Sequence, residues 1–171
     1  MSSPGRKCST CCKKIRPEDK NLRVGVGKVS GSAVFYEMDV DSVSTFNTSV
    51  AQNNQYNKSI VSQNKVEILT LAEIFINQFM VYGQVCDLLS VDVEGNNFEV
   101  LAGNDWQRFR PSYIIIEMPA AERLDIVPYL YQKGYFLIFD NSLNGIFKDS
   151  GVAGPHPYPD SFSECLKPHR A

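Results

Sequence analysis

The most informative part of the sequence for the fold is Cys86-Asp-Leu-Leu-Ser-Val-Asp-Val-Glu-Gly-Asn-Asn-Phe-Glu-Val-Leu-Ala-Gly103. Its first part is an apolar run that predicts a buried strand, and this strand carries two carboxylates at alternate positions near its end, Asp92 and Glu94. Gly95 then breaks the strand. Both carboxylates are therefore expected at the strand end.

A helix is predicted directly after this strand. Asn96 and Glu99 have the spacing of a capping box, and Gly103 suits the C-terminal stop of the helix. Open α/β sheets bind their ligands beyond the carboxyl ends of the strands. The two carboxylates therefore fall where chemistry would be done.

Length and composition indicate one domain with a real core, because the chain has 171 residues of which 43% are hydrophobic. The formal net charge is −2 and no charged block points to a nucleic acid. No apolar run approaches the roughly 18 residues of a membrane helix, and no signal peptide precedes the polar N-terminus. We expect a cytoplasmic protein without a nucleic-acid or membrane partner.

The odd number of cysteines, with one of them inside the predicted core strand, argues against a secreted disulfide framework. Three cysteines near the N-terminus include a C-x-x-C pair, but a structural zinc site takes four ligands and both histidines lie at the far end of the chain. A frayed N-terminal end is favoured over a zinc site. The residues concerned are Cys8, Cys11, Cys12, Cys86, Cys165, His156 and His169.

Composition divides the chain into a flexible basic segment at residues 1–20, a domain at residues 21–149 and a Pro-rich tail at residues 150–171. Within the domain, residues 21–38 alternate like two strands around turn residues and predict a hairpin. Residues 39–64 are polar and predict a long loop, which in a compact domain is either a functional lid or disordered.

Two further strand–helix pairs are predicted. A short strand at residues 66–69 precedes a helix from Leu71 that Thr70 can cap. A second apolar run at residues 112–117 ends in Glu117 and suits a parallel strand covered on both faces. The helix after it, at residues 120–133, has the apolar face Leu124, Val127, Leu130 and Tyr131, and Pro128 inside it indicates a kink or a later start.

Strands at residues 134–140 and 145–148 then pair as an antiparallel edge. The order of strands and helices from residue 86 onward predicts an α/β fold. Its sheet is expected to be open and mostly parallel, with a C-terminal antiparallel hairpin.

Three motifs occur in a fixed order: Leu89-Ser-Val-Asp-Val-Glu-Gly95, then Phe98 to Leu101, then Arg110-Pro111 before the run that ends at Glu117. In these motifs the chain resembles the FkbM-type methyltransferases, which use S-adenosylmethionine and have a Rossmann-like sheet. Residues 21–36, 66–74, 134–135 and 144–147 agree with the family's neighbouring strands and helices, so the resemblance covers roughly residues 15 to 150. It implies methyl transfer to a hydroxyl oxygen of a small molecule or glycan.

Three departures from the family pattern stand out. Asn97 occupies a position that is usually acidic, and the tail after Ser150 has no clear family counterpart. The family's glycine-rich cofactor turn and the acidic residue after its second strand are missing, since only some twenty residues precede Asn21. The sequence therefore predicts a domain truncated at its N-terminus, whose open sheet edge invites a partner chain or a homo-oligomer.

The resemblance implies roles for the residues at the strand ends. Asp92 is the expected base or substrate ligand and also a cofactor contact, Glu94 orients substrate or cofactor, and Gly95 belongs to the cofactor site. Glu117 and Asn97 are substrate candidates. A magnesium ion on the carboxylates at positions 92, 94 and 117 is chemically open, since oxygen ligands suit that ion, but no metal is favoured.

Structural roles must be set beside these. Carboxylates at strand ends often cap the following helix or bind loop amides. Trp106, Phe109 and Tyr113 could form an aromatic binding box, although packing in or beside the core is favoured.

Three classes of function stay open on sequence alone: an O-methyltransferase, a non-catalytic methyltransferase-like subunit that binds a partner, and a small-molecule binding module. The missing glycine-rich turn counts against an enzyme that works alone.

Overall fold

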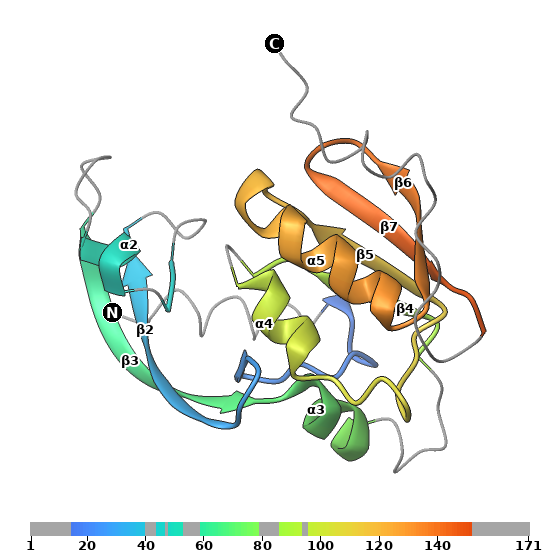
Figure 1. Ribbon diagram of the computed structural model, residues 1–171. Helices are drawn as coiled ribbons and strands as arrows, with labels where there is room; N and C mark the ends of the chain where they lie inside the picture. Colours follow the sequence, from blue (N-terminus) through green and yellow to red (C-terminus); the bar gives the residue numbers. More distant parts are fainter. Residues whose placement is uncertain are drawn as a thin grey trace. The chain divides into compact units, whose positions relative to one another are not determined.

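The computed structural model describes residues 15–39, 44–46, 48–52, 59–78, 86–93 and 96–151 (Figure 1). The chain forms two compact units, one with residues 1–25 and 30–69 and the other with residues 26–29 and 70–171. Several predicted features lie outside the described residues: Cys8, Cys11, Cys12, Cys165, His156, His169, Glu94 and Gly95. The predicted domain boundaries stay predictions.

The first unit is built on a three-stranded sheet in the order β1-β3-β2. Its strands are β1 (Gly25–Val26), β2 (Gly31–Met38) and β3 (Ile60–Leu69), and a short helix α2 (Thr48–Gln52) lies between β2 and β3 in the chain. β2 and β3 are antiparallel, from the pair Gly31 and Ile68 to the pair Met38 and Ile60. The predicted hairpin at residues 21–38 is therefore wrong, because β3 lies between β1 and β2.

β3 begins at Ile60, six residues before the strand predicted at residues 66–69, and its first half is not predicted because it carries polar side chains. Ser62 and Asn64 alternate with exposed neighbours as strand residues do, but they are polar where a core strand would be apolar. Both donate to one carboxylate oxygen of the buried Glu37 on β2, and Asn64 also donates to the Ser62 hydroxyl at 2.9 Å. Hydrogen bonds thus replace apolar contacts here, and the predicted loop at residues 39–64 is wrong where α2 and β3 occupy it.

The second unit contains a four-stranded sheet in the order β4-β5-β7-β6 (Figure 1). Its strands are β4 (Leu88–Val91), β5 (Tyr113–Glu117), β6 (Tyr135–Asp140) and β7 (Asn144–Asp149). β4 and β5 are parallel, whereas β7 is antiparallel to both β5 and β6. The C-terminal hairpin is confirmed, but a mostly parallel sheet is wrong for the described strands, because β7 inserts between β5 and β6.

The mixed α/β class is confirmed, and the Rossmann-like arrangement stays a prediction. Among the described strands, β4 has only β5 as a neighbour and stands at the end of the sheet order. The predicted partner for an open sheet edge stays a prediction as well.

The helices of the second unit are α3 (Leu71–Gln78), α4 (Asn97–Ala102) and α5 (Ala120–Gln132). The predicted cap of α3 is confirmed. The Thr70 hydroxyl accepts a hydrogen bond from the Glu73 amide at 3.2 Å, and the Glu73 carboxylate accepts one from the Thr70 amide at 2.8 Å. These two hydrogen bonds form a complete capping box, so residues of the same segment cap the first turn of α3.

Helix α5 begins at Ala120 and continues through Pro128, so a later start of this helix is wrong. One residue of its predicted apolar face is also wrong, since Leu124 is 59% exposed and Ile126 is fully buried. The buried positions 126, 127, 130 and 131 follow helical spacing without position 124.

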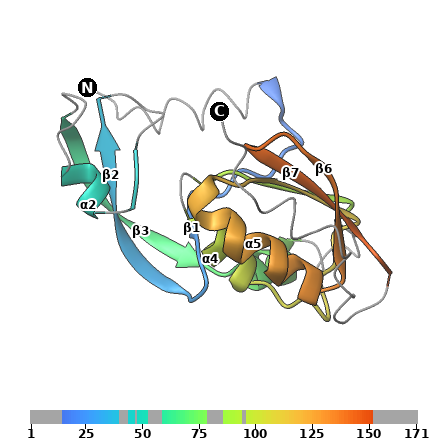
Figure 2. The same cartoon turned by 45° about the horizontal axis from the view of Figure 1, so that its top comes forward.

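Helices α4 and α5 lie side by side along the four-stranded sheet (Figures 1 and 2). They contribute buried side chains to one core with α3 and the strands: Leu71, Phe75, Val91, Val100, Leu101, Ile114, Ile116, Ile126, Val127, Leu130, Tyr135 and Phe147. No helix within the described ranges is both long and apolar enough to cross a membrane.

Gly103 ends α4, as predicted, for a reason that the sequence does not reveal. Its φ of −84° is ordinary for any residue. A Cβ atom at this position, however, would lie 2.3 Å from the main-chain oxygen of Gly27. Glycine is therefore required by the close approach of two main-chain segments.

Candidate functional site

The carboxyl ends of β4 and β5 lie at one edge of the four-stranded sheet, here called the carboxyl edge. The last registered pair is Val91 and Ile116, and each strand places a carboxylate one position further along, Asp92 and Glu117. Asp92 is exposed and Glu117 is half-buried. Two of the residues predicted for the site thus occupy equivalent positions on neighbouring strands.

Asn97 holds the connection between β4 and α4. Its side-chain oxygen accepts a hydrogen bond from the Val93 amide at 3.1 Å, and the whole side chain is buried. Its Nδ2 is buried too and has no hydrogen-bond partner among the described residues. The structure therefore gives Asn97 a role in shaping this connection, and its contact with a substrate stays a prediction.

The predicted capping box at the start of α4 is wrong. Asn96 is the N-cap residue, but its side chain makes no capping hydrogen bond. Its main chain has φ −130° and ψ 25°, outside the extended conformation in which a cap side chain normally reaches the first-turn amides.

A residue that the sequence analysis did not single out caps α4 instead. The Phe98 amide, in the first turn of α4, donates to the Glu122 carboxylate at 3.1 Å. Glu122 belongs to the first turn of α5, which follows β5. No local pattern could have found this contact, because the two residues are 24 positions apart.

The next residue of α5 ties the same helix end to the sheet. Arg123 forms an ion pair with Asp140 at the end of β6, and one guanidinium nitrogen donates to Asp140 Oδ1 at 3.1 Å. β6 runs parallel to β5, since both are antiparallel to β7. Asp140 therefore also lies at the carboxyl edge.

The three aromatic residues considered as a binding box have separate surroundings. Trp106 is buried and donates from its indole nitrogen to the Leu101 carbonyl oxygen at 3.1 Å, whereas Phe109 stacks on Phe75 at 5.3 Å between ring centroids. Tyr113 is 38% exposed, with the Lys148 ammonium group 5.9 Å from its ring centroid. Packing in and beside the core accounts for Trp106 and Phe109.

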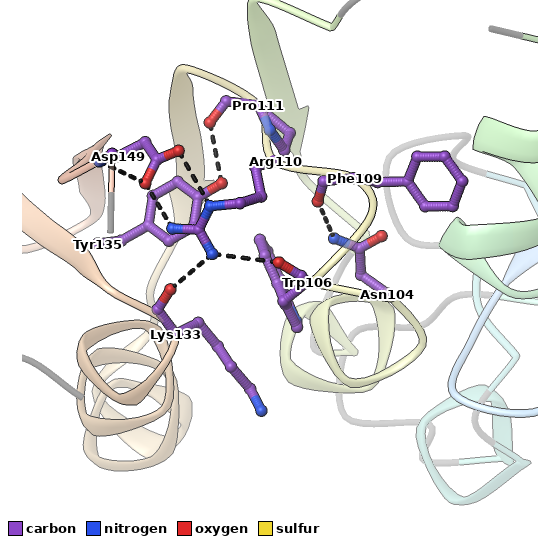
Figure 3. Close-up of polar contacts among 9 residues, drawn as sticks. Asn104, Trp106, Phe109, Arg110, Pro111, Lys133, Tyr135 and Asp149 are labelled. Atoms are coloured by element: carbon purple, nitrogen blue, oxygen red, sulfur yellow. Dashed lines mark hydrogen bonds and ion pairs between the residues drawn. The ribbon is translucent and has the colours of Figure 1, made fainter. Parts of the chain in front are cut away.

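The opposite edge of the sheet carries a dense polar cluster, here called the amino-edge cluster, of Trp106, Arg110, Tyr135 and Asp149 (Figure 3). Arg110 Nε donates to Asp149 Oδ2 at 3.1 Å, and Nη1 donates to the carbonyl oxygens of Trp106 at 3.1 Å and Lys133 at 2.9 Å. This arginine joins the segment before β5 to the end of α5 and the end of β7. Arg110, noted in the sequence as part of a family pattern, thus has a structural role.

Two ionisable groups of the amino-edge cluster are perturbed. The hydrogen bond that Arg110 donates to Asp149 raises the pKa of Arg110, and burial raises the pKa of Tyr135, which is fully buried. The Tyr135 hydroxyl donates to the Pro111 carbonyl oxygen at 2.9 Å. Both shifts favour the protonation states that these hydrogen bonds need.

Across the part of the chain that the structure describes, no group of three or more histidine, cysteine, aspartate or glutamate residues could hold a metal ion. The carboxylates considered for magnesium include Glu94, which lies outside that part.

Comparison with known proteins gives one match. A family model described as the methyltransferase FkbM domain matches residues 3–137, which include Asp92, Asn97 and Glu117 of the carboxyl edge but not Asp140. No curated protein and no solved structure matches the chain.

Proposed function

Because the chain belongs to the FkbM methyltransferase domain family, we propose that it transfers a methyl group from S-adenosylmethionine to a hydroxyl oxygen of a small molecule or glycan. The observation that carries the proposal is the family match over the segment that bears Asp92 and Glu117. Membership supports methyl transfer in general, while the methyl donor and the hydroxyl acceptor are our inference.

The residues at the carboxyl edge fit such a donor. S-adenosylmethionine supplies an activated methyl group on a positively charged sulfonium when bound. Asp92 offers an exposed carboxylate of the opposite charge, and the buried Asn97 has an amide donor without a partner among the described residues. Asp92 and the main chain of Gly95 would hold the donor.

Asp92 is our choice for the base that takes the hydroxyl proton as the oxygen attacks. Methyl transfer to a hydroxyl needs the acceptor in line with the bond that breaks and a base within hydrogen-bond reach of its proton. An exposed carboxylate at a strand end can meet both needs, because the strand fixes its main chain while its oxygens remain accessible.

The other residues would hold the acceptor. Glu94, two positions after Asp92, orients substrate or donor, and the half-buried Glu117 on the neighbouring strand can bind an acceptor hydroxyl. Asn97 acts on the reaction by holding Val93 in place or through its Nδ2, which has no hydrogen-bond partner among the described residues.

Calorimetric titration of S-adenosylmethionine, and of its demethylated product, into the purified chain tests the proposal. We expect micromolar binding that is weakened by Asp92→Asn and unchanged by Asp125→Asn, which removes an exposed carboxylate from α5. Screening of hydroxyl acceptors with a methyl-labelled donor would follow. A folded chain that binds neither compound would contradict the proposal and favour a non-catalytic subunit.

A further inference from the structure

Helix α4 is too short to be stable by itself. It has six residues, and isolated helices shorter than about 12 residues are marginal in water. Its first-turn amides also need acceptors, which the Asn96 side chain does not provide. The order of α4 must therefore come from its neighbours.

Helix α5 supplies contacts at both ends of α4. Glu122 accepts the hydrogen bond from the Phe98 amide at the first turn. Tyr129, seven residues later on α5, donates its hydroxyl to the Leu101 carbonyl oxygen at 3.4 Å, and its ring meets the Phe98 ring edge-on at 5.3 Å. Residues seven apart lie on one side of a helix, so a single side of α5 holds α4 along its length.

The first turn of α4 in turn holds the strand-end connection. Asn97 is the first residue of α4, and its side chain accepts the hydrogen bond from the Val93 amide. If the first turn of α4 frays, Asn97 loses its fixed position and the Val93 amide loses its acceptor. The order of the segment that carries Asp92 therefore depends on what caps α4.

We infer that Glu122 is a positioning residue for the proposed methyl transfer: by capping α4 from the neighbouring helix, it holds Asn97 in place, and Asn97 in turn holds the Val93 amide next to Asp92. This inference rests on the proposed function, since a reaction gives the position of Asp92 its importance. Glu122 does not touch a substrate in this account.

Hydrogen exchange followed residue by residue by NMR tests the structural part without any turnover. In Glu122→Ala the Phe98 amide should exchange about tenfold faster, the size expected for the loss of one helix cap. The Val93 amide should accelerate with it. Glu122→Gln keeps an acceptor oxygen, so the Phe98 amide of this variant should exchange at a rate within about threefold of that in the wild-type chain.

Asp125→Ala is the matched control, because it removes an exposed carboxylate from the same helix. If Glu122→Ala unfolds the chain, Glu122→Leu takes its place, since it keeps the side-chain stem and removes only the acceptor. Unchanged exchange at Phe98 would overturn the inference. Faster exchange at Phe98 with unchanged exchange at Val93 would overturn it too, since Glu122 would then be only a helix cap.

Kinetics test the link to the reaction. In Glu122→Ala we expect kcat to fall about tenfold or more with little change in the acceptor KM, and Glu122→Gln to recover most of the loss. Loss of acceptor binding with an unchanged kcat would contradict a positioning role. A wild-type chain that neither binds S-adenosylmethionine nor transfers methyl groups would refute the proposed function, whereas the exchange data would still decide whether Glu122 orders the connection.

Discussion

The amino-edge cluster and Asp92 lie at opposite edges of the four-stranded sheet and use charge in opposite ways. In the amino-edge cluster, Arg110 donates hydrogen bonds to Asp149 and to two main-chain carbonyl oxygens. The side chains of Arg110 and Asp149 are each only 17% exposed. At the carboxyl edge, Asp92 is exposed next to Val93, whose main-chain amide donates to the Asn97 side chain.

The difference distinguishes charged residues that stabilise the fold from charged residues that are available for a reaction. A charged group whose hydrogen bonds are all directed at its own protein holds elements together, but it has little left for a ligand. An exposed carboxylate on a well-held main chain contributes little to stability and is available for reaction. Substitution of Arg110 should therefore mainly lower stability, whereas substitution of Asp92 should mainly lower activity.

The largest effect on activity is expected at the carboxyl edge. Asp92→Asn should lower the rate of methyl transfer by about 100-fold or more, because it removes the base, while the free energy of unfolding changes by less than about 0.5 kcal/mol. Initial rates and chemical denaturation measure the two quantities. Turnover close to that of the wild type would refute the assignment of Asp92.

The largest effect on stability is expected in the amino-edge cluster. Arg110→Met should lower the free energy of unfolding by about 2–3 kcal/mol, because Asp149 and two carbonyl oxygens lose their donor in a partly buried site. Arg108→Met, at an exposed arginine above the Phe109 ring, should cost less than about 1 kcal/mol.

Trp106 is the only tryptophan of the chain, so its fluorescence reports directly on the unfolding of this cluster. Equal costs for the two arginine variants would break the contrast between a cluster residue and a surface residue.

A smaller effect is expected for Tyr135→Phe, which should cost about 1–2 kcal/mol at neutral pH, since the Pro111 carbonyl oxygen loses its buried donor. The effect should depend on pH. Burial raises the pKa of Tyr135 above its value in the unfolded chain, so the phenol stabilises the fold below that value, near pH 10, and the contribution is lost as pH rises.

Denaturation of both proteins between pH 8.5 and pH 11 should therefore show their difference in unfolding free energy shrinking as pH rises. A constant difference across this range would mean that Tyr135 ionises alike in the folded and unfolded chains.

The smallest effect is expected for Asn96→Ala at the carboxyl edge. It should change the unfolding free energy by less than about 0.5 kcal/mol, because the side chain makes no capping bond. Thr70→Ala, in the capping box of α3, should cost about 1 kcal/mol. Thermal unfolding of the two variants side by side checks this contrast. A larger loss of stability for Asn96→Ala than for Thr70→Ala would support the capping box that the sequence suggests for α4.

The two capping patterns also show what could be read from the sequence. Thr70 with Glu73 and Asn96 with Glu99 have the same spacing, yet only the first pair forms the box. The reason is tertiary, since Glu122 reaches the first turn of α4 from another helix and the main chain at Asn96 turns its side chain away. The spacing of two residues predicts a cap only from contacts within one segment, whereas the cap of α4 comes from another helix.

The strand pairings show the same limit. Apolar runs at residues 88–91 and 113–116 identified β4 and β5, and their parallel pairing followed from the intervening helix. The polar Ser62 and Asn64 hid β3, because their burial becomes favourable only when β2 brings Glu37 beside them. The pairing of β7 between β5 and β6 was likewise not encoded in any local pattern.

The sequence alone determined the α/β class, the family, the strand end with Asp92 and the parallel pair that brings Glu117 to the same edge. Such features depend on short-range periodicity and on motifs with fixed spacing. Only the tertiary structure decided which carboxylate caps α4, why Arg110 and Gly103 are needed, and how the antiparallel strands are ordered. These depend on groups far apart in the chain, whose hydrogen bonds and close approaches exist only once the chain has folded.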